Sequence, residues 1–136
     1  MPLWRRRHNW ERLHAALEDL RDVLILPESA EGSRPSWFGF LMTIREEAGL
    51  TREGVVRYIE EHNVQTRMLF SGNILRHPAF DSLHENKDYR VIGDLHVTEE
   101  IMHRTFWVGV YPGMTDEMID AMADVIHAAV KRGGGE

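Results

Sequence analysis

Apolar side chains recur every three or four residues near the start of the chain, which is the spacing of an amphipathic helix. Leu13, Leu17 and Leu20 form this apolar stripe and predict a helix over residues 9–22. Residues 1–8 come before it and contain three consecutive arginines. We expect these first residues to form a basic arm that projects from the start of the helix.

Two later stretches have the same spacing, and each begins at a threonine that can cap a helix. The hydroxyl of Thr51 can accept a hydrogen bond from the free backbone N–H groups of a helix that runs to about His62. Thr115 can do the same for a last helix near the C-terminus. The inner face of that helix is predicted to consist of Met118, Ile119, Met122, Val125, Ile126 and Ala129. A shorter helix is expected over residues 98–104.

Four segments are rich in β-branched and aromatic residues and predict strands. They cover residues 23–26, 37–44, 64–70 and 105–111. The segment 37–44, WFGFLMTI, is almost wholly apolar, so we expect it to be the central strand and to be buried on both faces. Residues 74–97 have an irregular pattern that indicates a loop-rich excursion.

Helices and strands therefore alternate along the chain without an internal repeat. This order predicts a fold of the α/β class, more closely a two-layer α+β arrangement in which a small sheet of antiparallel type is covered by helices. A length of 136 residues suffices for one hydrophobic core. We expect a single domain over residues 1–131 and a flexible tail over residues 132–136.

Composition narrows the classes of function. The chain has 16 Lys and Arg against 22 Asp and Glu, a formal net charge of −6, and so lacks the basic excess of a general nucleic-acid-binding protein. No apolar run approaches the roughly 20 residues of a membrane span. We expect a cytoplasmic protein that binds neither nucleic acid nor membrane. Because the chain has no cysteine, disulfides, thiolate zinc sites and cysteine nucleophiles are excluded.

Three residues have the spacing of metal ligands. His96, Glu100 and His103 would share one face of a continuous helix and could hold a divalent metal, as in a small metal-dependent hydrolase. Neither a zincin pattern nor a thiolate accompanies them. We interpret them as a solvated helix edge and predict no resident metal.

The segment 66–77, TRMLFSGNILRH, is better suited to binding. It combines the guanidinium groups of Arg67 and Arg76 with Asn73 in a predicted turn, and these donors suit phosphate or sugar hydroxyls. The alternative is a surface loop with solvated charges. Nothing in the residues themselves supplies a convincing nucleophile, base or cofactor anchor, so they indicate a fold class without an activity.

Three separated strings carry a family resemblance: SRPSWFGFLMTIRE (33–46), VQTRMLFSGNILRHPAF (64–80) and MHRTFWVGVYPGMTDEMID (102–120). They closely resemble the C-terminal part of the CDP-4-keto-6-deoxy-D-glucose 3-dehydrases of lipopolysaccharide O-antigen synthesis. Those enzymes form a branch of the DegT/DnrJ/EryC1/StrS sugar-aminotransferase family. The similarity extends over about residues 9–131, in the same order and with similar gaps.

The resemblance implies the C-terminal small domain of the aspartate-aminotransferase fold. The family's dehydrase uses pyridoxamine phosphate, held in a large N-terminal domain, on a nucleotide-sugar substrate, and an iron–sulfur reductase completes the 3-deoxygenation. We expect this chain to lack that large domain and therefore to be a fragment of such an enzyme, inactive alone. A homodimer or other self-association would cover the apolar surface that the missing domain leaves exposed.

The resemblance also implies a binding site, because the small domain closes over the active site in this family. The candidates for substrate binding are Arg67, Asn73, Arg76, Trp37, Phe38 and Phe70. The polar residues would contact the substrate or its phosphates, and the aromatic residues would form the cleft wall. No catalytic role is transferred to this chain. An interface salt bridge or a core aromatic is the structural alternative for each residue, and a stand-alone binding or assembly module is the alternative function.

Overall fold

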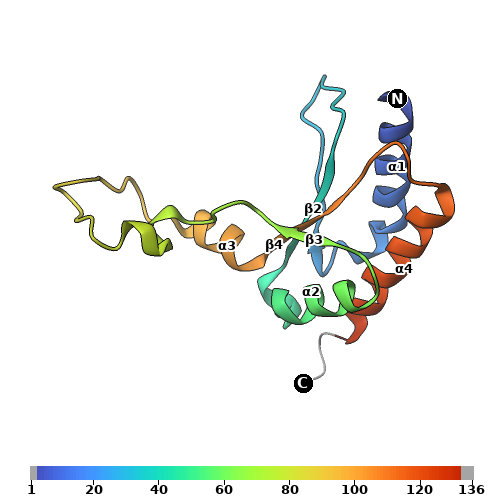
Figure 1. Cartoon of the computed structure of the whole chain (residues 1–136). Helices are drawn as coiled ribbons and strands as arrows, with labels where there is room; N and C mark the ends of the chain where they lie inside the picture. Colours follow the sequence, from blue (N-terminus) through green and yellow to red (C-terminus); the bar gives the residue numbers. More distant parts are fainter. Residues whose placement is uncertain (1–2, 133–136) are drawn as a thin grey trace.

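Four strands form one sheet at the centre of the molecule, with helices packed on it (Figure 1). The computed structural model describes residues 3–132. Of the predicted tail 132–136, Arg132 belongs instead to the last helix, and residues 133–136 lie outside the described residues. The helices are α1 (Leu3–Ala16), α2 (Arg52–Glu61), α3 (His96–Arg104) and α4 (Asp116–Arg132). The strands are β1 (Leu24–Ile25), β2 (Gly39–Ile44), β3 (Thr66–Met68) and β4 (Thr105–Gly109).

The sheet has the strand order β1-β2-β4-β3, and each neighbouring pair is antiparallel. The longest pairing joins β2 to β4 and runs from Gly39 opposite Gly109 to Thr43 opposite Thr105. This arrangement confirms the predicted small antiparallel sheet covered by helices. It also confirms that the apolar segment around residue 40 forms an interior strand.

The two faces of β2 differ in burial. Phe40, Met42 and Ile44 are fully buried, whereas Leu41 and Thr43 between them are partly exposed. The prediction that this strand is buried on both faces was therefore wrong. Its apolar run reflects one face packed in the core and a second face that carries apolar side chains at the surface. Trp37 and Phe38 also precede the strand, which begins at Gly39.

Helix α2 agrees with its prediction: the Thr51 hydroxyl accepts from the backbone N–H of Gly54 at 3.2 Å, while Val55 and Ile59 are buried. Helix α4 buries Ile119, Met122, Ile126 and Ala129 of the predicted face, whereas Val125 is partly exposed. Met118 is 45% exposed and lies beside an open hollow also lined by Tyr111. None of the helices within residues 3–132 combines the length and hydropathy that a bilayer span requires.

Helix α1 begins at Leu3, so the predicted basic arm was wrong for the described residues 3–8. The three arginines belong to the helix, and two of them bind distant parts of the chain. Arg5 donates to the Asp116 carboxylate at 2.7 Å. Arg7 donates to the carbonyls of Arg34 and Pro35 at 2.7 and 3.2 Å. The helix ends earlier than predicted, at Ala16, although the leucine stripe is buried as expected.

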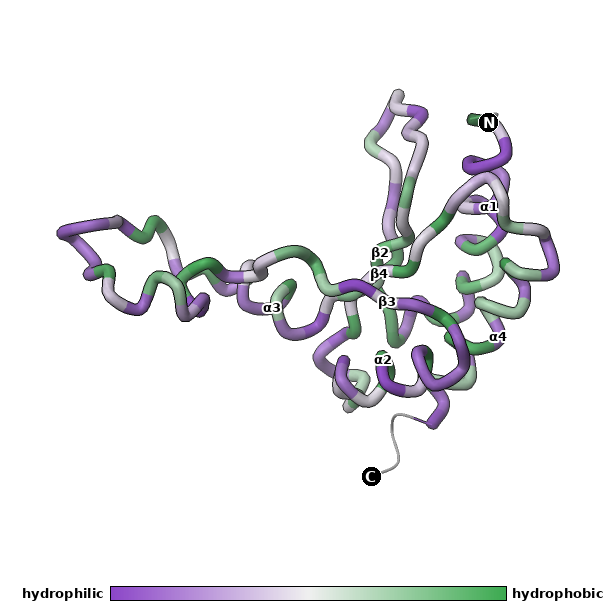
Figure 2. The backbone as a smooth tube through the Cα atoms, in the orientation of Figure 1, coloured by the Kyte–Doolittle hydropathy of each residue, from purple (hydrophilic) through white to green (hydrophobic). Residues whose placement is uncertain are grey.

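Residues 69–95, which we call the arm, connect β3 to α3 and extend away from the sheet (Figure 1). Apart from two short 3₁₀ turns, at Ile74–Arg76 and Pro78–Phe80, and isolated turns, the arm has no regular structure, as its irregular pattern predicted. Hydrophilic and hydrophobic positions are mixed along it (Figure 2). Asn73 is its one buried residue, so the arm has no core of its own.

Candidate functional site

Two aromatic rings meet on the face of the sheet opposite the core. Phe38 and Trp107 pack edge to face, with ring centroids 5.3 Å apart and planes at 83°. The absence of a side chain at Gly39 makes room for the indole, since a Cβ there would lie 2.5 Å from Cε3 of Trp107. Phe38 is 63% exposed. We call Phe38 and Trp107 the aromatic patch.

Arg67 adjoins the aromatic patch because it stands opposite Trp107 in the pairing of β3 with β4. Its side chain is exposed and makes no hydrogen bond or ion pair with any residue of the described range 3–132. The indole N–H of Trp107 donates to the Met68 carbonyl at 3.3 Å, which fixes the ring beside β3. Strand register therefore places an exposed arginine beside Trp107, and a cation next to an aromatic ring suits anionic and planar ligands.

Phe70, two residues after the end of β3, has a left-handed conformation with φ of 48°, and 81% of the residue is exposed. This conformation is unusual for an aromatic residue and directs the chain from the sheet into the arm. A mostly apolar hollow of about 380 Å³ lies at this bend. It is lined by Leu69, Phe70, Ser71, Gly72, Ile74, Thr98 and Ile101.

Asn73 and Arg76 both bind Glu99 of α3. The Asn73 amide and the Arg76 Nε donate to the same carboxylate oxygen, the latter at 3.0 Å. The hydrogen bond from Asn73 has the largest effect on Glu99, and that from Arg76 the next largest; both lower the pKa of Glu99 below its usual value. Asn73 is buried, whereas the Arg76 side chain is 68% exposed and binds Glu99 through Nε.

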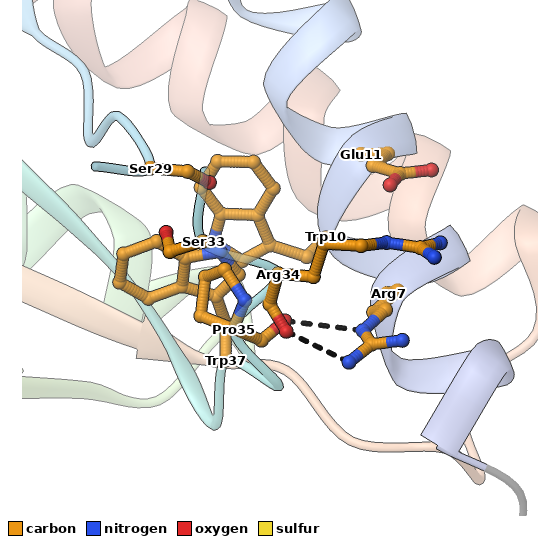
Figure 3. Close-up of a pocket in the computed structure, with 8 residues that line it drawn as sticks. All are labelled: Arg7, Trp10, Glu11, Ser29, Ser33, Arg34, Pro35 and Trp37. Atoms are coloured by element: carbon orange, nitrogen blue, oxygen red, sulfur yellow. Dashed lines mark hydrogen bonds between the residues drawn. The ribbon is translucent and has the colours of Figure 1, made fainter. Parts of the chain in front are cut away.

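Trp37 lies apart from the aromatic patch. Its ring stacks on Trp10 of α1, with centroids 5.1 Å apart and planes at 10°. Together they border a hollow of about 100 Å³ between α1 and the loop before β2 (Figure 3). Arg7 holds this loop against α1 through the two carbonyls described above (Figure 3). The structure thus places Phe38, just before β2, and Arg67 of β3 beside Trp107. Phe70 lies beyond the other end of β4, next to Thr98 and Ile101 of α3, and Trp37 packs on α1.

The candidate metal ligands form separate ion pairs on α3. His96 faces Glu100 at 3.6 Å, whereas His103 faces Glu99 at 3.4 Å. Within residues 3–132, no group of three or more His, Asp or Glu side chains gathers around a common point. The pairs follow the helix surface, as the interpretation of a solvated edge proposed.

Sequence reasoning did not single out Trp107 or Glu99. The alternation in TFWVG is a signal for the first, because Phe106 and Val108 are buried and Trp107 between them faces outward. That it meets Phe38 and Arg67 depends on strand register, which the pattern does not specify. Glu99 carried no comparable signal, since its partners come from another segment of the chain.

Comparison with known proteins places these features in a family. Residues 3–127 match the model of the DegT/DnrJ/EryC1/StrS aminotransferase family. The chain is 48% identical over 121 residues to dTDP-4-dehydro-2,6-dideoxy-D-glucose 3-dehydratase of Saccharopolyspora spinosa. It is 44% identical over 115 residues to the lipopolysaccharide biosynthesis protein RfbH of Salmonella typhimurium. These matches cover 89% and 85% of this chain, which spans about a quarter of the length of each of these curated relatives.

Solved structures share the fold. GDP-4-keto-6-deoxy-D-mannose-3-dehydratase of E. coli, with bound hydrated PLP, superposes with a TM-score of 0.78 at 22% identity, over 91% of this chain and 30% of that one. DesI, in the presence of its TDP-sugar product, gives a TM-score of 0.75 at 20% identity, over 97% of this chain and 32% of that one. The aminotransferase-type fold expected from the sequence is confirmed. The chain belongs to the DegT/DnrJ/EryC1/StrS aminotransferase family.

Proposed function

We propose that this chain is the C-terminal small domain of a pyridoxamine-phosphate-dependent nucleotide-sugar 3-dehydrase, inactive by itself. The proposed substrate is CDP-4-keto-6-deoxy-D-glucose, and the proposed partners are a cofactor-binding large domain and an iron–sulfur reductase. The observation that carries the proposal is the 48% identity to a sugar 3-dehydratase, over a quarter of that relative's length. Among the structural relatives, one structure of a GDP-4-keto-6-deoxymannose 3-dehydratase contains hydrated PLP, and one of a mutant form contains GDP-perosamine.

We propose no cofactor site within residues 3–132 of this chain. Its two lysines are Lys87 in the arm and Lys131 in the last turn of α4, and both are exposed. Arg67 stands on an open sheet face, without the enclosing donors that a cofactor phosphate requires. We therefore assign the cofactor to the large domain, and to this chain only the binding of substrate.

We propose that the aromatic patch and Arg67 form the substrate-binding wall. The guanidinium of Arg67 would bind a phosphate, and the rings of Phe38 and Trp107 would contact the base or sugar. Arg76 would contribute through its terminal nitrogens, and Phe70 through its exposed ring. Asn73 and Trp37 lie apart from this wall, against Glu99 and Trp10, and we propose that they hold the start of the arm and the loop before β2 in place.

The arm is the proposed contact surface for the large domain. Its apolar side chains are exposed although they have no core beneath them, and a partner would remove them from water. The exposed fractions are 81% for Phe70, 55% for Ile74, 40% for Phe80, 40% for Leu83 and 74% for Ile92. Self-association through the same residues, as in a homodimer, would be visible by sedimentation of the isolated chain.

A chimera tests the proposal. This chain would replace the aligned quarter of the S. spinosa relative, and turnover of dTDP- and CDP-linked 4-keto sugars would be measured with pyridoxamine phosphate and a reductase. We expect turnover by the chimera and none by the isolated chain. A folded, cofactor-loaded chimera without turnover on either sugar would favour the stand-alone binding module. Binding of pyridoxamine phosphate to the isolated chain, seen as a shifted absorption band, would contradict our assignment of the cofactor.

Replacing Arg67 by Ala tests the substrate-binding wall in the same chimera. Loss of a charged hydrogen bond to phosphate should raise KM for the nucleotide-sugar about tenfold or more, with kcat and the thermal midpoint nearly unchanged. Arg57, an exposed arginine of α2, provides the matched control variant Arg57→Ala, which should leave KM unaltered. Equal KM values for both variants would remove Arg67 from the binding wall.

A further inference from the structure

The first residues of the arm are held to the body of the protein at one carboxylate. Asn73 and Arg76 donate to one oxygen of Glu99, and the His103 ring lies 3.4 Å from the other. Both oxygens are therefore engaged, by two side chains of the arm and one of α3. Glu99 itself is only 25% exposed.

Asn73 connects this carboxylate to the backbone of the arm. While its amide nitrogen donates to Glu99, its side-chain oxygen accepts from the backbone N–H of Leu75 at 3.0 Å and so caps the following 3₁₀ turn. Its own backbone N–H points to the sulfur of Met102 at 3.3 Å. Asn73 is only 4% exposed, so without Glu99 its amide would be left unsatisfied.

The backbone before Asn73 lies close to α3. Gly72 has φ of 62°, and a Cβ at this position would overlap the side chain of Met102. Two residues earlier, Phe70 is also left-handed. Residues 70–73 therefore lie against α3 in a conformation that few sequences adopt unaided, and such conformations persist when the surroundings enforce them.

From these contacts we infer that Glu99 is a positioning residue: its carboxylate, through Asn73 and Arg76, holds residues 70–76 against α3 and fixes the direction in which the Phe70 ring is presented. The arm beyond residue 77 depends on this attachment for its orientation. The inference concerns the isolated chain and does not require the proposed function.

Hydrogen exchange followed by mass spectrometry tests this role in the isolated chain. Glu99→Ala should accelerate amide exchange of residues 70–77 about tenfold or more, and Glu99→Gln, which keeps one acceptor oxygen, should accelerate it less. Asn73→Ala should have a similar local effect. The double variant should exchange no faster than the faster single variant, because both changes disrupt the same attachment.

Glu100 provides the matched control, because it is the next residue of α3 and pairs only with His96 on the same helix. Glu100→Gln should leave exchange of residues 70–77 at the wild-type rate, and exchange of β2 and β4 should be the same in all variants. Wild-type exchange of residues 70–77 in Glu99→Ala would overturn the inference. Faster exchange throughout the sheet in Glu99→Ala would overturn it as well, because Glu99 would then stabilise the whole fold.

Discussion

Gly39 and Gly109 face each other across β2 and β4, yet their surroundings differ. The indole of Trp107 occupies the space next to Gly39, whereas no atom lies within 4 Å of a Cβ built at Gly109. At the scale of single residues, the aromatic patch therefore depends on one missing side chain. Adding one methyl group at each of these glycines should therefore change the free energy of unfolding by different amounts.

Gly39→Ala should lower the free energy of unfolding by about 1–3 kcal/mol, because the new methyl group overlaps the Trp107 ring. It should also alter the near-ultraviolet circular dichroism of the indole. Gly109→Ala should change the free energy by no more than about 0.5 kcal/mol. Urea unfolding of both variants measures the difference, and equal destabilisation would show that Trp107 moves aside freely.

At the scale of elements, the first and last helices are joined by charges. Asp116 at the start of α4 contacts Arg5 at 2.7 Å, His8 at 3.1 Å and Arg12 at 3.3 Å, all on α1. The hydrogen bond from His8, followed by the charges of Arg5 and Arg12, lowers the pKa of Asp116 below its usual 3.8. Protonation of Asp116 at low pH should therefore weaken the contact between α1 and α4.

The pH dependence has a definite sign. Because the folded-state pKa of Asp116 is lowered, its stabilising contribution is present above pH 3.8 and is lost as the pH falls through the folded-state value. Asp116→Asn should therefore reduce the urea midpoint at pH 6, and the difference from wild type should shrink progressively below pH 4. Asp124→Asn, at an exposed position of the same helix, is the control. A difference that persists unchanged at low pH would contradict this account.

Elements with local signals could be predicted from the sequence. Thr51 caps α2 as expected, and the alternation of TFWVG marks β4. The start of α1 could not be predicted, because Arg5 in its first turn donates a hydrogen bond to Asp116, more than a hundred residues away. The same applies to the candidate site, where strand register brings Trp107 to Arg67. Residue types indicated which side chains could bind a ligand. Long-range contacts within the fold decide which of those side chains lack a partner in the protein.

At the scale of the whole molecule, a sheet with a well-packed core carries an arm that has none. Phe40, Phe106 and Ile126 are fully buried in the body, while Asn73 is the only buried residue of the arm. Regions with few buried contacts open at low cost in free energy. The arm and the sheet should therefore differ widely in the rates at which they open.

In the isolated chain, amides of residues 78–95 should exchange hydrogen much faster than those of β2 and β4. In the chimera described above, the same amides should become protected as the large domain covers the arm. Phe70→Ser, which removes the most exposed aromatic ring, should weaken that protection, whereas Tyr111→Ser, on the far side of the sheet next to α4, should not. Unchanged exchange of the arm in the chimera would argue for a different docking surface.

The strand order has a consequence for synthesis on the ribosome. β4 lies between β2 and β3 but is made after both, so neither of them has its main partner when it leaves the exit tunnel. Until β4 is synthesised, the strand between β2 and β3 is missing from the sheet. Phe40 and Met42, which are buried in the folded protein, then remain exposed to water. A polypeptide stopped before residue 105 should therefore be a substrate for chaperones rather than a smaller folded protein.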